Sequence, residues 1–248
     1  PITVYLFCKF FLNKKRIDLN NLKFENVKNK IITNDLFVLN LILIIFLFLE
    51  FFSIEFPVNK IDIYHEGQKL SAPFKSLIDE KLWSGSFVTT GIINENLGVK
   101  FIWKILDHQS IGSMRYLQLL YILLFKLLLL ILIYFISNNI LSNQNLKLVF
   151  YLVSAILTLY LIDYDVGSAD VFSYRDLPVI LCLIFFFKNF DNQKNINLSL
   201  ILISLLSILS FFWSIDRAIN VNLLIIFICL YLLLNKNYKN VISIIVFI

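Results

Sequence analysis

The feature that most constrains this chain is a succession of long apolar runs separated by shorter polar segments. A helix of about 20 apolar residues spans the ~30 Å hydrocarbon core of a bilayer. The first clear run lies at about 36–56. Further runs follow at about 116–137, 147–164, 177–190, 198–214 and 218–235, and another begins near Val241. We therefore predict an all-α fold, a polytopic bundle of transmembrane helices.

Composition supports a membrane protein. Hydrophobic residues make up 59% of the chain, charged residues only 16%, and the mean hydropathy is +0.80. A soluble domain of 248 residues could not bury so much apolar surface, so we expect the lipid bilayer as a partner. The excess of Lys+Arg (22) over Asp+Glu (17) does not indicate a nucleic-acid partner, because the lysines flank apolar runs as in cytoplasmic membrane loops.

The predicted organisation has four parts. They are a lysine-rich cytoplasmic N-terminal segment (1–35), the first clear span (36–56), an outer-face loop (57–114) and a transmembrane bundle of about five further spans plus a truncated one (115–248). The chain begins without a methionine and stops inside an apolar run too short to span. We therefore expect a fragment of a longer membrane protein, with the number of spans beyond Ile248 left open.

The orientation follows from the lysines, because segments rich in lysine remain in the cytoplasm. If residues 13–35 are cytoplasmic, then the loop at 57–114 and the turns at 163–176 and 214–217 lie on the outer face. All six glycines then lie on that face or at its border, at positions 67, 85, 91, 98, 112 and 167. Irregular backbone gathered on one face supports this topology.

The outer loop contains two sets of apolar residues at helical spacing. The sets are Phe74, Leu77, Ile78 and Leu82, and Val99, Ile102, Trp103 and Leu106. We predict two short amphipathic helices, at about 74–83 and 99–106. We expect them to lie along the membrane surface, with Trp83 and Trp103 at headgroup level.

The first candidate site opens this loop, where Asp62, His65 and Glu66 directly follow the first span. A general base needs a carboxylate or imidazole beside the substrate hydroxyl, and a boundary position can raise a carboxylate's proton affinity by desolvation. The alternative is a solvated loop start whose charges face water. A metal site at His65 is unspecific, because no second histidine lies at ligand spacing.

The second candidate is the set of arginines. Arg115, Arg175 and Arg217 lie at the outer ends of three different predicted spans. A planar guanidinium binds phosphate oxygens in a bidentate manner, so we expect at least one phosphate contact among them. The alternative is pairing with the aspartates that follow or precede them, Asp176 and Asp216. Neighbours on a helix do not face each other, so such pairs would involve other elements.

The third candidate is an acidic turn. Asp163, Asp165 and Asp170 occupy one short predicted outer turn, and Asp176 follows. Their carboxylates could bind a divalent cation or the hydroxyls of a sugar. The alternative is a solvated turn whose aspartates cap the next helix.

Lys126 lies in the middle of a predicted span, where a charge is costly in lipid. We expect its side chain to face the bundle interior or to extend toward the interface. A structural partner such as Glu50 is favoured over a catalytic role.

The pattern resembles the GT-C superfamily of integral-membrane glycosyltransferases, which includes the protein O-mannosyltransferases and the bacterial aminoarabinose transferases. These enzymes have a first span entering from the cytoplasm, a long outer loop with an acidic motif and surface helices, and many spans joined by short turns. Here Asp62 and Glu66 occupy the position of the acidic motif. The family's acidic pair is adjacent or nearly so, whereas Ile-Tyr-His separates these two carboxylates, which leaves open which one is the base.

The resemblance implies a polyprenyl-phosphate-linked sugar as donor, a glycan, lipid or protein hydroxyl as acceptor, and inverting transfer on the outer, periplasmic face of a bacterial inner membrane. It does not identify the sugar, a metal requirement or the oligomeric state. Two other classes remain open. A transporter or flippase of lipid-linked saccharide would need charges along the spans, and a surface-polysaccharide polymerase or ligase would carry its large loop late in the chain.

Overall fold

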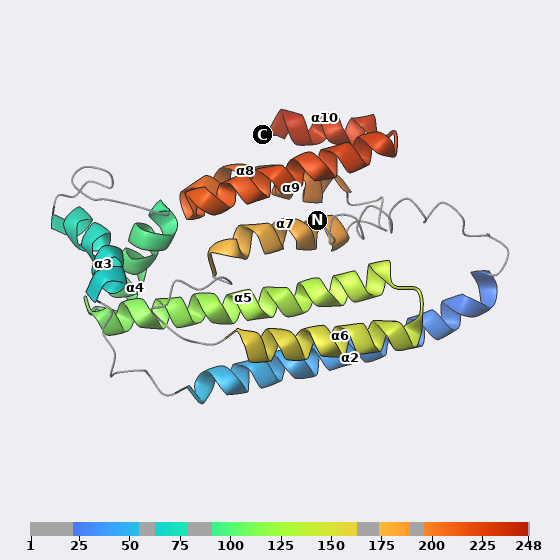
Figure 1. Ribbon diagram of the computed structural model, residues 1–248, viewed down its shortest axis with the longest axis horizontal. Coiled ribbons are helices and arrows are strands. Elements are labelled where there is room, and N and C mark those ends of the chain that lie inside the picture. Colours follow the sequence, from blue (N-terminus) through green and yellow to red (C-terminus); the bar gives the residue numbers. More distant parts are fainter. Residues whose placement is uncertain (1–21, 55–62, 79–90, 163–173, 189–195, 248) are drawn as a thin grey trace. The chain divides into compact units, whose positions relative to one another are not determined.

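The computed structural model describes residues 22–54, 63–78, 91–162, 174–188 and 196–247, and all regular elements within them are helices (Figure 1). The all-α prediction is therefore confirmed. The elements are α2 (Leu22–Phe52), α3 (Ile63–Ile78), the π-helix η2 (Ile93–Leu97), α4 (Gly98–Leu106), α5 (Ile111–Ile140), α6 (Gln144–Leu161), the 3₁₀-helix η3 (Tyr174–Asp176), α7 (Leu177–Lys188), α8 (Ile196–Trp213), α9 (Ile215–Leu234) and α10 (Tyr238–Phe247).

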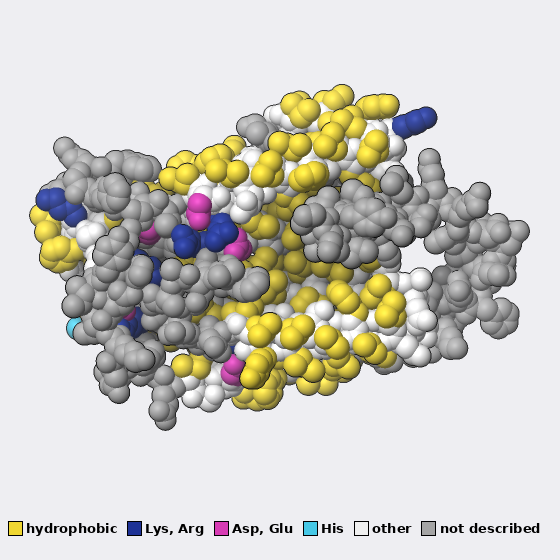
Figure 2. Space-filling view, viewed as in Figure 1, with side chains coloured by type: hydrophobic (Ala, Val, Ile, Leu, Met, Phe, Trp, Pro, Cys, Tyr) yellow, Lys and Arg dark blue, Asp and Glu magenta, His cyan; other side chains and the backbone are white. Residues whose placement is uncertain are grey.

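Three of these helices, α5, α6 and α9, are long and apolar enough to cross a membrane. Shorter apolar helical stretches cover Leu36–Phe52 and Leu198–Trp213. Figure 2 shows apolar side chains over much of the described helical surface, with few charges among them. These features indicate association with a membrane. At 1.5 Å per residue, the 12 residues of α7 reach only about 18 Å, so this predicted span is shorter than a bilayer core.

The helix that contains the first predicted span begins before it. The span is predicted at about 36–56, and one helix runs from Leu22 to Phe52, so it includes the end of the lysine-rich segment. This stretch contains neither glycine nor proline, so nothing in the backbone interrupts the helix. Residues 1–39 and 40–248 form two compact units, and the packing described below is that of residues 40–248.

The core of this second unit has two main parts. In one, α5 packs against α7, and Phe125, Ile180 and Phe187 are buried between them. In the other, α8 packs against α7, α9 and α10 around Ile203, Val221 and other buried apolar side chains. The helix α5 also contacts α4 and α6, so it connects the first part to the short helix α4.

Polar pairs join the end of α2 to the helices α5 and α6. Lys126 on α5 is fully buried, and its Nζ donates to Glu50 Oε1 at 3.3 Å and to the Leu159 carbonyl at 3.4 Å. The predicted Lys126–Glu50 partnership is confirmed. The Tyr151 hydroxyl donates to Asn40 Oδ1 at 2.7 Å. Between apolar helices, such polar pairs determine which helix faces pack together, because apolar contacts alone discriminate poorly between alternative helix faces.

The predicted surface helices are only partly confirmed. The helix α4 matches the second of them, but its Val99, Ile102 and Trp103 are buried against Met114 and Leu117 of α5. The Trp103 indole donates to the Ser110 carbonyl at 3.2 Å. The apolar face of α4 therefore packs against protein, and the position of Trp103 at headgroup level stays a prediction.

The first predicted surface helix is also displaced along the sequence. The helix α3 begins at Ile63 and ends at Ile78, with Pro73 inside it, whereas the prediction covered 74–83. Leu82 and Trp83 lie outside the described residues.

We expect the variant Glu50→Gln to lower the free energy of unfolding by about 2 kcal/mol, because it leaves the Lys126 ammonium buried without this carboxylate. The value is below that of fully buried pairs because the Glu50 side chain is 32% exposed. The double variant Glu50→Leu/Lys126→Met should lower the free energy of unfolding by less than Glu50→Gln does. Unfolding of the full chain by sodium dodecyl sulfate in mixed micelles measures both, with Lys188→Gln on the exposed end of α7 as control. Additive losses would contradict the pairing.

Candidate functional site

The structure describes five of the predicted site residues. Glu66 and His65 lie on α3, Arg115 on α5, Arg175 on η3 and Arg217 on α9. Asp62, Asp163, Asp165 and Asp170 lie outside the described residues, so their predicted roles remain predictions.

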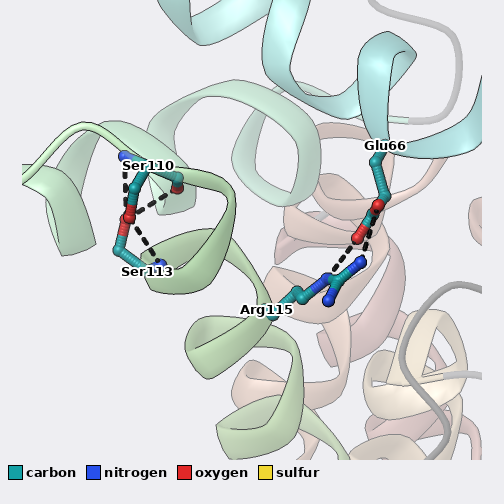
Figure 3. A network of polar contacts seen from close by, with 4 residues as sticks. All are labelled: Glu66, Ser110, Ser113 and Arg115. Carbon is teal, nitrogen blue, oxygen red and sulfur yellow. Dashed lines mark hydrogen bonds and ion pairs between the residues drawn. The ribbon is translucent and has the colours of Figure 1, made fainter. Parts of the chain in front are cut away.

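Glu66 and Arg115 form a buried bidentate ion pair with each other (Figure 3). Arg115 Nε donates to Glu66 Oε1 at 2.5 Å, and Nη2 donates to Oε2 at 2.9 Å. Glu66 is 1% exposed and Arg115 is 5% exposed. Parallel guanidinium–carboxylate bonds of this kind are both strong and directional. The pair therefore fixes α3 against the start of α5.

A capping box sets the start of α5. Ser110 Oγ accepts a hydrogen bond from the Ser113 backbone N–H at 3.1 Å, and Ser113 Oγ accepts one from the Ser110 N–H at 3.3 Å. This reciprocal arrangement satisfies backbone donors that a helix start otherwise leaves without partners. Figure 3 shows the box one turn before Arg115 on the same helix. Because the capping box fixes where α5 begins, the local sequence determines the position of Arg115 in the first turns of this helix.

Arg175 and Arg217 converge on one aspartate, Asp216. Arg175 Nη1 lies 3.6 Å from Asp216 Oδ2, and Arg217 Nε lies 3.4 Å from both Asp176 Oδ1 and Asp216 Oδ2. The pairs between η3 and α9 agree with the expectation that these residues pair with other elements. The contact between the adjacent Asp216 and Arg217 differs from it. Burial raises the pKa of the Asp176 carboxyl, and Arg217 counteracts part of that shift.

The π-helix η2 contributes polar residues that the sequence reasoning missed. Asn94, Glu95 and Asn96 are consecutive and all buried. Ser76 of α3 donates to Asn96 Oδ1 at 2.9 Å. Three consecutive side chains can be buried because η2 contacts α3, α4 and α8. The signal in the sequence is the polar Asn-Glu-Asn run between apolar residues. The structure shows that this run forms a π-helical turn, and such turns often mark functional sites.

Tyr174 connects η2 to the arginines. Burial raises the pKa of its hydroxyl to about 12, and the nearby side chains of Asn94 and Gln118 counteract part of that shift. The Tyr121 ring centroid lies 5.4 Å from that of Tyr174 and 5.1 Å from that of Trp213. Tyr174 directly precedes Arg175, and Gln118 lies one turn after Arg115. One connected cluster therefore joins η2, η3, α5 and α8.

Two buried polar atoms of this cluster, Gln118 Oε1 and Trp213 Nε1, have no hydrogen-bond partner among the described residues. One is an acceptor and the other a donor. A buried polar atom without a partner carries a desolvation cost, which a hydrogen-bonding ligand that reached it would offset.

A close backbone approach joins η2 to the start of α9. A Cβ added at Gly91 would overlap the Trp213 carbonyl group and lie 2.8 Å from the Ser214 nitrogen. Only glycine permits this approach, so Gly91 brings η2 directly against the turn that precedes Asp216 and Arg217.

No group of three potential ligands among the described residues could hold a metal ion. The acidic turn at Asp163, Asp165 and Asp170 lies outside the described residues. The divalent cation remains a prediction that concerns those three residues.

No protein family, curated protein or solved structure matches this chain.

We expect Gly91→Ala to lower the free energy of unfolding by about 3 kcal/mol, because its methyl group would collide with rigid backbone. The matched control is Gly67→Ala on α3, where an added Cβ meets nothing within 4 Å and helix propensity favours alanine by up to about 1 kcal/mol. Unfolding of both variants in mixed micelles tests this. Equal stability of the two would refute the close contact.

Proposed function

We propose that this chain is a membrane glycosyltransferase of the GT-C type. It transfers a sugar from a polyprenyl-phosphate-linked donor to an acceptor hydroxyl, with inversion. The observation that carries this proposal is the convergence of Arg175 and Arg217, from two different elements, on the carboxylate of Asp216. These arginines adjoin a polar cluster with unpartnered buried atoms.

The arginine pairs suit a transient anion. The Arg175 and Arg217 side chains are about a quarter exposed, and their distances to the aspartates are 3.4 to 3.6 Å. Partly exposed ion pairs of this length contribute little to stability. A phosphate can compete with the aspartates, because bidentate arginine–phosphate bonds are stronger than such contacts.

Arg115 has a different role in this proposal. Its guanidinium is held by Glu66 in a buried bidentate pair, so both residues maintain the structure on which the cluster is built. Among the predicted phosphate contacts, Arg175 and Arg217 are thus favoured over Arg115. Among the predicted bases, Asp62 is favoured over Glu66.

The proposed reaction follows from these roles. The Asp62 carboxylate accepts the proton of the acceptor hydroxyl, and the oxygen's electron pair forms a bond to the anomeric carbon of the sugar. The bond between that carbon and the phosphate oxygen breaks on the opposite side, and its electron pair leaves with polyprenyl phosphate. Arg175 and Arg217 stabilise the charge that develops on this leaving group.

The proposed topology puts the N-terminal lysine-rich segment in the cytoplasm and the site on the periplasmic side of a bacterial inner membrane. The lysines at 13–35 support this orientation. The starts of α5 and α9, which carry two of the arginines, then lie at the same membrane face.

The transporter alternative has less support. It requires charges along the spans, and within the described apolar helices Lys126 is already engaged by Glu50 and a backbone carbonyl. A polymerase or ligase of surface polysaccharide shares the arginine requirement. Release of polyprenyl phosphate together with a glycosylated acceptor distinguishes transfer from transport.

We expect Asp62→Asn to reduce transfer by about 10² to 10⁴-fold, the range for loss of a general base. Arg175→Lys and Arg217→Lys should each reduce it by about 10²-fold, because the planar fork is lost. The assay uses membranes containing the full chain and a labelled polyprenyl-phosphate sugar. Asp35→Asn, which removes a carboxylate predicted to lie on the other face, is the control and should retain activity.

Glu66→Gln needs a parallel measurement of folded protein, because loss of its pair with Arg115 could lower activity through stability alone. If Asp62→Asn and Glu66→Gln both left transfer unchanged, the carboxylate-base assignment would be wrong. If polyprenyl phosphate were never released, the transferase proposal itself would fail.

A further inference from the structure

A second binding feature lies on α3 and α4, away from the arginine pairs. It is a groove of about 440 Å³, and its lining includes Leu77 of α3, Leu97 of η2, and Lys100, Phe101 and Lys104 of α4. None of these residues belongs to the proposed catalytic machinery. The groove therefore needs an explanation of its own.

The surface around the groove is unusually apolar for short helices. Phe74 and Ile78 of α3, and Phe101 and Ile105 of α4, are each more than half exposed. Neither α3 nor α4 is among the helices long and apolar enough to span a membrane. Contiguous exposed apolar side chains on such helices indicate contact with another molecule or with lipid.

The groove also carries positive charge. Lys100 and Lys104 are four residues apart on α4, so they lie on the same side of the helix. Within the described part of the chain, neither ammonium group forms an ion pair. Two like charges at this spacing repel each other, and an anion bound between them removes that repulsion. Asp107, at the end of the groove, offsets only part of the charge.

The position of the groove identifies the kind of anion. The buried face of α4 packs directly against Met114 and Leu117, in the first turns of α5. Because α5 is long and apolar enough to cross a bilayer, its start lies at headgroup level if it spans. An occupant at this depth meets the lysines with its charged part and the phenyl and leucine side chains with its apolar part.

We propose that this groove binds an anionic phospholipid. The headgroup phosphate lies between Lys100 and Lys104, and an acyl chain contacts Leu77, Leu97 and Phe101. Where basic residues lie beside an apolar surface, apolar burial and charge attraction both contribute to the binding of anionic lipids. Lipid binding in this groove depends on association with a membrane but not on glycosyl transfer. The lipid-binding proposal and the transferase proposal can therefore fail independently.

The test measures lipid binding to the purified full chain in detergent by native mass spectrometry. Phosphatidylglycerol and phosphatidylcholine with identical acyl chains are titrated separately. We expect phosphatidylglycerol to bind at least tenfold more tightly. Lys100→Gln/Lys104→Gln should weaken it by about 25-fold, at about fivefold per charge. Phe101→Ser should weaken it by about tenfold, through lost apolar contact.

The matched control is Lys188→Gln/Lys239→Gln, which removes two exposed lysines from other helices and should leave phosphatidylglycerol binding unchanged. Equal binding of the two lipids by the unmodified chain would overturn the proposal, whatever the variants do. An equal loss in the control would show that net charge alone attracts the lipid. Full displacement by inorganic phosphate at equal concentration would show a simple anion site, and would also overturn it.

Discussion

The buried pair between Glu66 and Arg115 is the interaction on which the candidate site depends. A charge in an apolar environment is tolerated only when an opposite charge with matching geometry satisfies it, and losing one partner costs far more than the pair contributes. Both side chains are almost inaccessible, and two parallel hydrogen bonds join them. This pair attaches α3 to α5, and α3 in turn holds η2 through Ser76 and Asn96. The polar cluster around Tyr174 is built on that attachment.

The same constraint applies along the helices. Lys126 with Glu50, and Tyr151 with Asn40, each match one polar group to another across apolar surfaces. The pairs of Arg175 and Arg217 are partly exposed and have long contacts, whereas both members of the Glu66–Arg115 pair are almost inaccessible. We therefore distinguish the closed pair of Glu66 and Arg115, which holds helices together, from the open pairs of Arg175 and Arg217, which can change partners. In the proposed function, the open pairs meet the substrate.

The sequence predicted those features that depend on local pattern. Apolar runs marked α5, α6 and α9, and the cost of a mid-span charge pointed from Lys126 to Glu50. The pairing of Glu66 with Arg115 could not be predicted, because 49 residues separate them and nothing local specifies the partner. Periodicity showed that Val99, Ile102 and Trp103 share a face, but it cannot distinguish lipid from protein as the material covering that face. Asn94 to Asn96 were missed because a π-helical turn departs from the 3.6-residue period.

That π-helical turn has a consequence for how this site could be gained or lost. A π-helical turn differs from an α-helical one by a single inserted residue, and η2 runs directly into α4. Deleting one residue between Ile93 and Leu97 would allow one regular α-helix from Ile92 to Leu106. The side chains before the deletion would then rotate by about 100° relative to those after it, one residue's turn of an α-helix. Asn94 would no longer face Tyr174 while Trp103 kept its packing. The polar cluster therefore depends on a single inserted residue, and its deletion would also displace Gly91 from its close approach to Trp213.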